Sequence, residues 1–163
     1  MRTSNAGNQA RLGLLDNLTP QQRKLSMSRV ASRNTRPEIA VRRVLHRLGY
    51  RFRLHQDNLP GSPDIVLPRQ RIAVFVHGCF WHGHSGCVRA ARPSTNVEFW
   101  NRKLDVNIQR DVAVQEKLAA AGWTPIVLWQ CTLKSSDSIE RAILVGLEPI
   151  INAKRDNTTD RRD

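Results

Sequence analysis

The sequence has few acidic residues, few cysteines and no long apolar run, and each shortage excludes a class of protein. Among 163 residues, 14 are acidic and 26 are basic, which gives a formal net charge of +12. No apolar run approaches the roughly 18 residues that a membrane-spanning helix needs. The three cysteines are an odd number and argue against a disulfide framework, so metal binding or plain burial remains for them.

The excess of positive charge predicts a polyanionic partner. Nucleic acid is favoured over a membrane surface, because no segment combines a basic face with a long apolar one. An RNA-binding protein would fit the charge, but the chain offers no aromatic sheet platform for stacking bases. The first residues, MRTSNAGNQARLG, lack the apolar segment of a secretory signal. We therefore expect a cytoplasmic, nucleoid-associated protein.

The length suits one domain that is large enough to bury its own hydrophobic core. We expect a flexible N-terminal extension at residues 1–17, a single domain at residues 18–151 and a disordered polar tail at residues 152–163. Helices are predicted at residues 19–29, 35–48, 97–121 and 138–150, and strands at residues 51–54, 64–67, 72–77 and 124–129. This order predicts an α/β domain in which helices flank a mixed sheet.

Two of the predicted helices carry clear local signals. Thr35 and Glu38 form a capping box with proline just inside the helix, and Gly49 ends that helix. The buried face of the helix is predicted to consist of Ile39, Val44, Leu45 and Leu48. The buried face of the long helix at 97–121 is predicted to consist of Trp100, Leu104, Ile108, Val112, Gln115 and Leu118.

The most informative stretch is VFVHGCFWHGHSGC, residues 74–87, which holds three of the five histidines and two of the three cysteines. Phe80 and Trp81 lie among these potential metal ligands. An exposed loop does not need two wide aromatic side chains, and a buried core does not favour three histidines. Such a conflict between local rules indicates a functional site.

Zinc is the first interpretation of this stretch. Cys79, His84 and Cys87 lie close together, and Cys131 follows a strand far downstream. Three thiolates and one imidazole would satisfy tetrahedral zinc, and the remote ligand would tie the loop to the end of another strand. The alternative for Cys131 is a small buried hydrophobic residue.

Asp64 is a second candidate ligand, in the segment LPGSPDIVL. It stands at the start of a predicted strand, where a carboxylate at the sheet edge can hold a hard divalent cation. Phosphodiester cleavage uses such an ion to activate water and to neutralise charge on the phosphate. The alternative is a turn residue with no further role. The position of Asp64 one strand before the histidine-rich stretch favours the cation site.

Residues 25–133 resemble the very short patch repair (Vsr) DNA mismatch endonucleases. The resemblance rests on five pieces in this order: MSRVASRNTRPE, LPGSPDIVL, FVHGCFWHGH, EFWNRKLDVNIQRD and LWQCTL. It implies a restriction-endonuclease-like core related to the PD-(D/E)xK nucleases, with structural zinc and catalytic Mg²⁺. It also implies a bacterial enzyme that nicks one strand on the 5′ side of the thymine in a T·G mismatch. Such mismatches arise from deaminated 5-methylcytosine, which implies functional links to a cytosine-5 DNA methyltransferase and to mismatch-repair proteins.

The resemblance implies roles for five residues near the expected cation. Asp64 matches the aspartate that binds Mg²⁺, and the backbone carbonyl of Val76 is a second expected ligand. Glu38 matches a glutamate that approaches the metal through water. His77 and His82 match the two active-site histidines, and His82 is expected to take a proton from the attacking water. The alternative for both histidines is a structural place in the core.

Other residues match the DNA-binding surface of the family. Met27, Phe80 and Trp81 match side chains that wedge into the duplex beside the mismatch, where a mispaired step opens more easily. Packing of the aromatic pair against the zinc loop is the alternative. Lys103 and Asn107 match polar residues that reach DNA. Basic side chains near the N-terminus are expected to contact phosphates, namely Arg23, Lys24, Arg29, Arg33 and Arg36.

The chain departs from the family pattern at two places that affect the site. Val76 stands where a threonine is typical, so any contribution of the hydroxyl is lost while the backbone carbonyl remains. The zinc loop carries Gly83 and the pair Ser85–Gly86 instead of a continuous run of histidines, and His84 is the expected ligand.

Two rival functions and the oligomeric state complete the interpretation. A restriction-type or other structure-specific nuclease would need no wedge, so the Phe80–Trp81 pair disfavours it. A catalytically silent, zinc-containing DNA-binding protein would not need Asp64 and His82 where they are. Because a mismatch in an asymmetric context has no two-fold symmetry to mirror, we expect a monomer.

Overall fold

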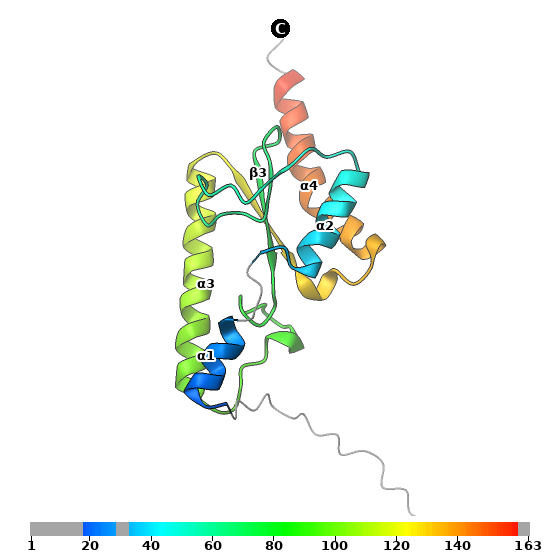
Figure 1. Cartoon of the computed structure of the whole chain (residues 1–163). Coiled ribbons are helices and arrows are strands. Elements are labelled where there is room, and N and C mark those ends of the chain that lie inside the picture. The colour runs from blue at the N-terminus through cyan, green and yellow to red at the C-terminus, as the bar shows by residue number, and fades with distance from the viewer. Residues whose placement is uncertain (1–17, 29–32, 160–163) are drawn as a thin grey trace, which may run out of the picture.

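The computed structural model describes residues 18–28 and 33–159, which form a four-stranded sheet with helices around it (Figure 1). The helices are α1 (Pro20–Ser28), α2 (Arg36–Arg47), α3 (Val97–Ala120) and α4 (Ser136–Thr159). The strands are β1 (Arg53–Leu54), β2 (Ile65–Leu67), β3 (Ile72–His77) and β4 (Thr124–Trp129), with short 3₁₀ turns at Val88–Ala90 (η1) and Gln130–Thr132 (η2). This order confirms the predicted mixed α/β arrangement.

The sheet has the spatial order β1-β2-β3-β4. β1, β2 and β3 are antiparallel neighbours, which short connections can join. β4 runs parallel to β3, and α3 makes the long crossover between them. The register pairs His77 with Trp129, so the carboxyl ends of the two parallel strands meet at one edge of the sheet.

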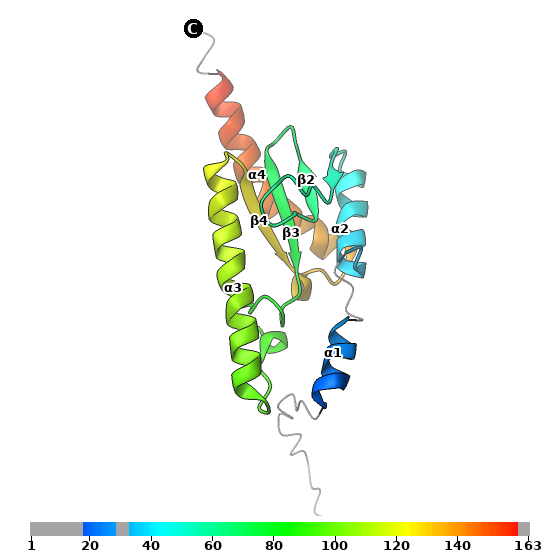
Figure 2. The same ribbon diagram turned by 60° about the vertical axis from the view of Figure 1, so that its left-hand side comes forward.

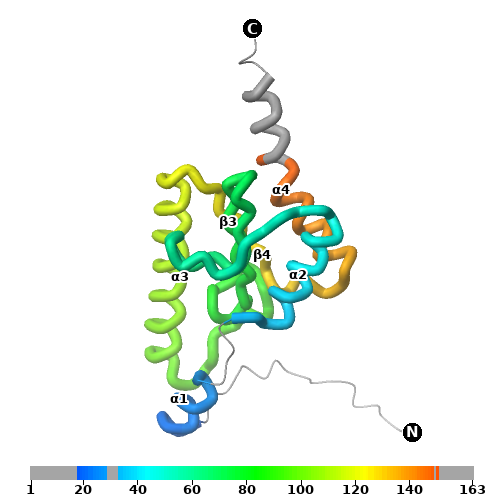
Figure 3. Tube along the Cα trace, turned by 45° about the horizontal axis from the view of Figure 1, so that its top comes forward, coloured from blue at the N-terminus to red at the C-terminus, as the bar shows by residue number. Residues whose placement is uncertain are grey.

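The two faces of the sheet are covered by different helices. α3 lies along one face, and α2 and α4 lie together on the other (Figures 2 and 3). The larger core lies on the α2–α4 side and consists of side chains from both helices and three strands, including Leu45, Ile65, Ile72, Leu128 and Ile143. A smaller core on the α3 side contains Ala73, Phe75 and Leu118. Alternate residues of β3 thus supply both cores, as the period of two in a strand requires.

The local signals of α2 are confirmed. The Thr35 hydroxyl accepts from the Glu38 N–H, the Glu38 carboxylate accepts from the Thr35 N–H, and Gly49 follows the helix with φ of 81°. The predicted buried face needs one correction. Val41 is fully buried and was missed, whereas Ile39 is only half-buried.

α3 ends where the sequence predicts, and Gly122 follows it with φ of 74°. Trp100, Leu104 and Leu118 are buried, but Val112 is half exposed and was wrongly placed on the buried face. Steps of four residues advance around a helix by about 40° more than a full turn, so a chain of such steps drifts off the face it started on. A residue two positions further along the helix, Val114, packs on the sheet instead.

α4 is longer than predicted. It runs to Thr159 and so includes residues 152–159, which the sequence analysis assigned to a disordered polar tail. Ala, Lys and Arg at 153–155 favour a helix without needing an apolar face. The expected extension at residues 1–17, Arg29 and residues 160–163 lie outside the described part of the chain. No helix within the described ranges is both long and apolar enough to span a bilayer.

Candidate active site and metal centres

A cleft of about 900 Å³ opens between α3, the N-terminal end of α2 and the carboxyl end of β3. Its lining includes all five residues predicted around the cation: Glu38, Asp64, Val76, His77 and His82. They come from α2, the loop before β2, β3 and the loop after β3. The fold therefore brings together residues that the sequence singled out in separate segments.

Asp64 faces this cleft because of its place in the strand alternation. Ile65, the first residue of β2, points into the α2–α4 core, so the side chain of the preceding residue lies on the α3 side of the sheet. One carboxylate oxygen of Asp64, Oδ2, accepts a hydrogen bond of 2.7 Å from the backbone N–H of Val76. This bond fixes the carboxylate beside the end of β3.

Burial raises the pKa of Asp64 to about 6, and the nearby Glu38 charge adds to the rise. The hydrogen bond from Val76 and the positive charges of Arg42 and His82 oppose it. Burial makes the charged form of this carboxylate unfavourable. A bound cation would stabilise the charged form, because it replaces the lost solvation.

The second expected oxygen ligand is the Val76 carbonyl. In a strand, the N–H and C=O of one residue point towards the same neighbour, so this carbonyl is directed to the side of Asp64. The Val76 side chain packs against the α2–α4 core, and the apolar substitution at this position therefore leaves the backbone donor intact. Two oxygen donors fit Mg²⁺, which keeps several waters and completes its shell with substrate oxygens.

His77, His82 and Asp111 form a compact group at the end of β3. The two imidazole rings stack with centroids 3.7 Å apart, and His82 Nδ1 lies 2.5 Å from Asp111 Oδ2. Their ligand atoms are close enough for a metal. His82 and Asp111 contact each other directly. The geometry suits an imidazole that is oriented by a carboxylate.

Asp111 was missed in the sequence. The signal was present, because Lys103, Asn107 and Asp111 follow one another at intervals of four residues along α3 and line the same cleft. Recognising it required knowing that this stripe of α3 faces the loop that carries His82.

Burial lowers the pKa of His77 to about 4, and the adjacent His82 adds to this effect. His77 is therefore neutral at neutral pH and can present one N–H donor and one acceptor nitrogen. It also contacts Trp129 of β4 edge-on, with ring centroids 5.5 Å apart. The side chain thus has a fixed place in the wall of the cleft.

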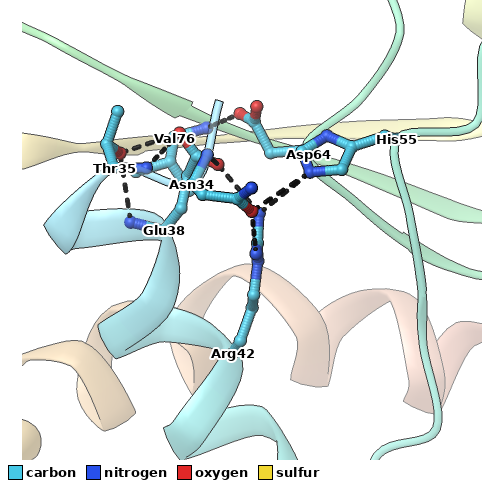
Figure 4. Close-up of polar contacts among 7 residues, drawn as sticks. All are labelled: Asn34, Thr35, Glu38, Arg42, His55, Asp64 and Val76. Atoms are coloured by element: carbon cyan, nitrogen blue, oxygen red, sulfur yellow. Dashed lines mark hydrogen bonds and ion pairs between the residues drawn. The ribbon is translucent and has the colours of Figure 1, made fainter. Parts of the chain in front are cut away.

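Glu38 lies at the opposite wall and is only 3% exposed (Figure 4). Its carboxylate accepts from the Thr35 hydroxyl at 2.7 Å and from the Arg42 guanidinium at 2.8 Å. The same side chain thus serves the capping box and borders the cleft.

Cys79, His84, Cys87 and Cys131 are brought together as predicted, with their ligand atoms all within 4.8 Å of one another. Cys131 Sγ lies 3.3 Å from His84 Nδ1. Adjacent ligand atoms around tetrahedral zinc are roughly 3.5–4 Å apart, so this donor set and its spacing fit the ion. Burial raises the pKa of the Cys79 thiol to about 11, and a bound metal would displace its proton.

Residues 79–87, which carry Cys79, His84 and Cys87, form a loop that lies against α3 at Gly83. Gly83 has φ of 61°, and a Cβ atom there would lie 2.4 Å from Cδ1 of Ile108. The left-handed backbone favours glycine at this position, and a larger residue would also push the end of the Ile108 side chain aside. The departure from a continuous histidine run therefore has a structural role: it brings the loop against the helix that carries Asp111.

The rings of Phe80 and Trp81 both pack against Trp100 of α3. The Phe80 ring meets the rings of Trp81 and Trp100 edge-on, at centroid distances of 5.1 and 5.3 Å. Trp81 lines the cleft together with Met27 of α1, whereas Phe80 is not among the lining residues. The aromatic cluster therefore presents one of its rings to the cleft.

The polar residues of α3 differ in their partners. Asn107 donates from Nδ2 to the Trp81 carbonyl at 3.1 Å, which ties the aromatic loop to the helix, and Lys103 lines the cleft beside it. Arg33 also lines the cleft. The expectation of a phosphate contact is wrong for Arg23, which is buried with its guanidinium over the Phe99 ring and thereby anchors α1 on α3.

Comparisons with known proteins match the chain along most of its length. A family model described as DNA mismatch endonuclease Vsr matches residues 15–89. A type II nicking enzyme of Xanthomonas oryzae is 47% identical over 136 residues, which cover 83% of this chain and 99% of that protein. A type II nicking enzyme of Neisseria meningitidis is 38% identical, over 75% of this chain and 86% of that protein. The DNA mismatch endonuclease Vsr of Escherichia coli is 35% identical over 77% of this chain and 81% of its own.

Proposed function

This chain belongs to the Vsr family of DNA endonucleases, and from that premise we propose that it nicks one strand on the 5′ side of the thymine in a T·G mismatch, with Mg²⁺ at Asp64. The observation that carries the proposal is the joint placement of two chemically complementary groups in one cleft. Asp64 and Val76, which offer oxygen donors, line the same cleft as the His82–Asp111 pair.

Each protein group has a defined task in this proposal. Asp111 accepts the Nδ1 proton of His82 and leaves Nε2 free to take a proton from the attacking water. His77, neutral and held by its stacking, donates a hydrogen bond to the phosphate. When bound, Mg²⁺ supplies positive charge to the scissile phosphate and makes water more acidic.

Recognition of the mismatch is assigned to the aromatic end of the cleft. Trp81 and Met27 approach the same space from the loop after β3 and from α1. A mispaired step costs less to open than a paired one, so side chains inserted there select for it. We assign Phe80 to the support of Trp81, and Lys103 and Asn107 to contacts with the bases or backbone near the mismatch.

The remaining expectations complete the proposal. The core is restriction-endonuclease-like, and Cys79, His84, Cys87 and Cys131 hold structural zinc. The enzyme acts as a monomer on double-stranded DNA in the bacterial cytoplasm. It repairs T·G mismatches left by deaminated 5-methylcytosine, in functional association with a cytosine-5 methyltransferase and mismatch-repair proteins.

Strand-specific nicking of end-labelled duplexes tests this function. Substrates carry one T·G mismatch in varied flanking sequence, with Mg²⁺ or EDTA, and matched duplexes serve as controls. The proposal expects Mg²⁺-dependent nicking 5′ of the thymine. Nicking of matched duplexes would favour a sequence-specific nicking or restriction-type enzyme, and binding in every context without nicking would favour the silent zinc-containing DNA-binding protein.

A further inference from the structure

Arg42 is a buried cation that the mechanism above does not use. Its side chain is 12% exposed and lies behind Glu38, outside the lining of the cleft (Figure 4). One guanidinium nitrogen, Nη2, donates to Glu38 Oε2 at 2.8 Å, and the other, Nη1, donates to Asn34 Oδ1 at 2.6 Å. Because its guanidinium is held by Glu38 and Asn34, we assign to Arg42 an effect on the site that acts through these neighbours.

Glu38 has all of its acceptor positions occupied. Oε1 accepts from the hydroxyl and the N–H of Thr35, at 2.7 and 3.3 Å. Oε2 accepts from the N–H of Asn34 at 2.9 Å and from Arg42. A carboxylate offers about four lone-pair sites, so Glu38 has none to spare for a direct metal bond. Its charge is also paired, because the guanidinium is permanently positive.

Asp64 differs from Glu38 in both respects. Among the described residues it accepts one hydrogen bond, from Val76, and no basic side chain forms an ion pair with it. The three charges nevertheless act on one another, because Glu38 raises the pKa of the Asp64 carboxyl and Arg42 lowers it. Asp64, Glu38 and Arg42 together thus contribute a net charge of −1 beside the proposed cation.

We propose that Arg42 is a positioning residue that holds Glu38 in the capping box and limits the cation site to one uncompensated carboxylate, Asp64, so that a DNA phosphate must complete the site. The inference rests on the proposed function in one respect, the cation at Asp64. It has two consequences. The free protein binds the cation weakly, and binding of the cation and of DNA strengthen each other.

Mn²⁺ titration of the zinc-loaded full-length protein tests the first consequence, with unbound Mn²⁺ followed by electron paramagnetic resonance. The summed charge of residues 38, 42 and 64 is −1 in the wild type, −2 in Arg42→Gln, 0 in Glu38→Gln and −1 in the double variant. A unit charge within one or two side-chain lengths of a divalent ion changes its affinity by about tenfold or more. We expect Arg42→Gln to bind Mn²⁺ about tenfold more tightly, Glu38→Gln about tenfold more weakly, and the double variant as the wild type does.

Two controls locate the effect. Arg43→Gln makes the same charge change at the next residue, which is exposed, and should leave the affinity for Mn²⁺ unchanged. Asp64→Ala should remove the Mn²⁺ site. A merely structural role of Arg42 predicts that both single variants weaken binding, and that result overturns the inference. Arg42→Gln binding no tighter than the wild type, or Mn²⁺ binding that survives Asp64→Ala, does so as well.

Loss of a buried ion-pair partner can unfold a protein, so the test does not depend on Arg42→Gln alone. Should that variant not fold, Glu38→Gln decides: an Mn²⁺ affinity equal to that of the wild type overturns the inference.

The second consequence is tested in the non-nicking His82→Ala protein. A T·G duplex should tighten Mn²⁺ binding at least about tenfold, after correction for Mn²⁺ on the DNA alone. A neutral methylphosphonate 5′ of the mismatched thymine should remove the gain, and a gain that persists contradicts the inference.

The proposed function and this inference fail separately. A wild type that does not nick T·G duplexes, while its variants follow the expected order of Mn²⁺ affinity, disproves the function and leaves the role of Arg42 standing. A wild type that nicks as expected, while Arg42→Gln and Glu38→Gln bind Mn²⁺ equally, disproves the inference alone.

Discussion

The Cys79–His84–Cys87–Cys131 cluster and the proposed cation site lie at the same end of β3, yet they are built in opposite ways. The cluster offers sulfur and nitrogen donors from four side chains, enough to close a tetrahedral shell around a metal. The cation site offers oxygen donors from Asp64 and Val76 and leaves most of the shell to water and substrate. A closed site can only hold the chain together, whereas an open site can take part in a reaction. Only Gly78 separates His77, which lines the cleft, from Cys79, which belongs to the cysteine–histidine cluster.

Asp64→Ala should break the open site and leave the closed one unaffected. Removal of the carboxylate takes away the main cation ligand, so nicking of a T·G duplex should fall by about 10³-fold or more. DNA affinity and zinc content should stay at their wild-type values. The exposed Asp137, at the start of α4, supplies the matched control Asp137→Ala. Retained nicking would show that Asp64 is not the cation ligand.

Cys131→Ala should break the closed site. It removes one of the four ligands and the tie between β4 and the loop after β3, and should cost about 3 kcal/mol or more of the free energy of unfolding. Thermal unfolding and zinc content measure the effect, with the neighbouring exposed Thr132→Ala as control. Cobalt substitution of the wild type should give thiolate charge-transfer bands. A metal-free protein of unchanged stability would show that the cluster is not a metal site.

Asp111→Asn tests whether the reaction in the cleft depends on the His82–Asp111 pair. The amide no longer orients His82 with a negative charge, so nicking should fall by about 100-fold while DNA affinity is kept. His82→Ala should abolish nicking, and the double variant should be no worse than His82→Ala alone. Asp105→Asn, on the exposed side of the same helix, is the control. Equal rates for Asp111→Asn and the wild type would remove Asp111 from the mechanism.

The smallest expected effect concerns pH and the cost of leaving the open site without a cation. The folded-state pKa of Asp64 is about 6, above its unfolded value near 3.8. The folded protein therefore binds the proton more tightly, and Mg²⁺-free protein loses stability as pH rises from about 4 to above 6. Asp64→Asn should be more stable than the wild type at pH 7.5, by about 2 kcal/mol, and the difference should vanish below about pH 4. Chemical denaturation at several pH values in Mg²⁺-free buffer measures it; a difference that does not depend on pH contradicts the assignment.

The elements and most members of the site could be predicted because their signals are local. The capping box of Thr35 and Glu38, the strand 72–77 and the loop ligands Cys79, His84 and Cys87 each depend on residues within one turn or one loop. The errors concern which face of a helix is buried, because that depends on the element packed against it. Val112 and Ile39 satisfied an apolar period, but the packing surface of each helix is set by what lies against it.

The partnerships within the site were not available from such patterns. Asp111 meets His82 across 29 residues of chain. Glu38 and Arg42 stand four residues apart, a spacing that allows an ion pair on a helix, but only the fold buries that pair. Phe80 and Trp81 were singled out as aromatic, but only the fold shows that they rest on Trp100 and that one of them faces the cleft.

The sequence by itself thus determined the order of helices and strands, the chemical types of donor and the family, because each depends on neighbours along the chain or on matching letters. The tertiary structure alone decided which donors share a centre, which carboxylate is free and which is paired, and where the cleft opens. These depend on burial and on contacts between segments far apart in the sequence. The same aspartate or glutamate is a cation ligand or a helix cap according to the charges and hydrogen bonds that the fold places around it.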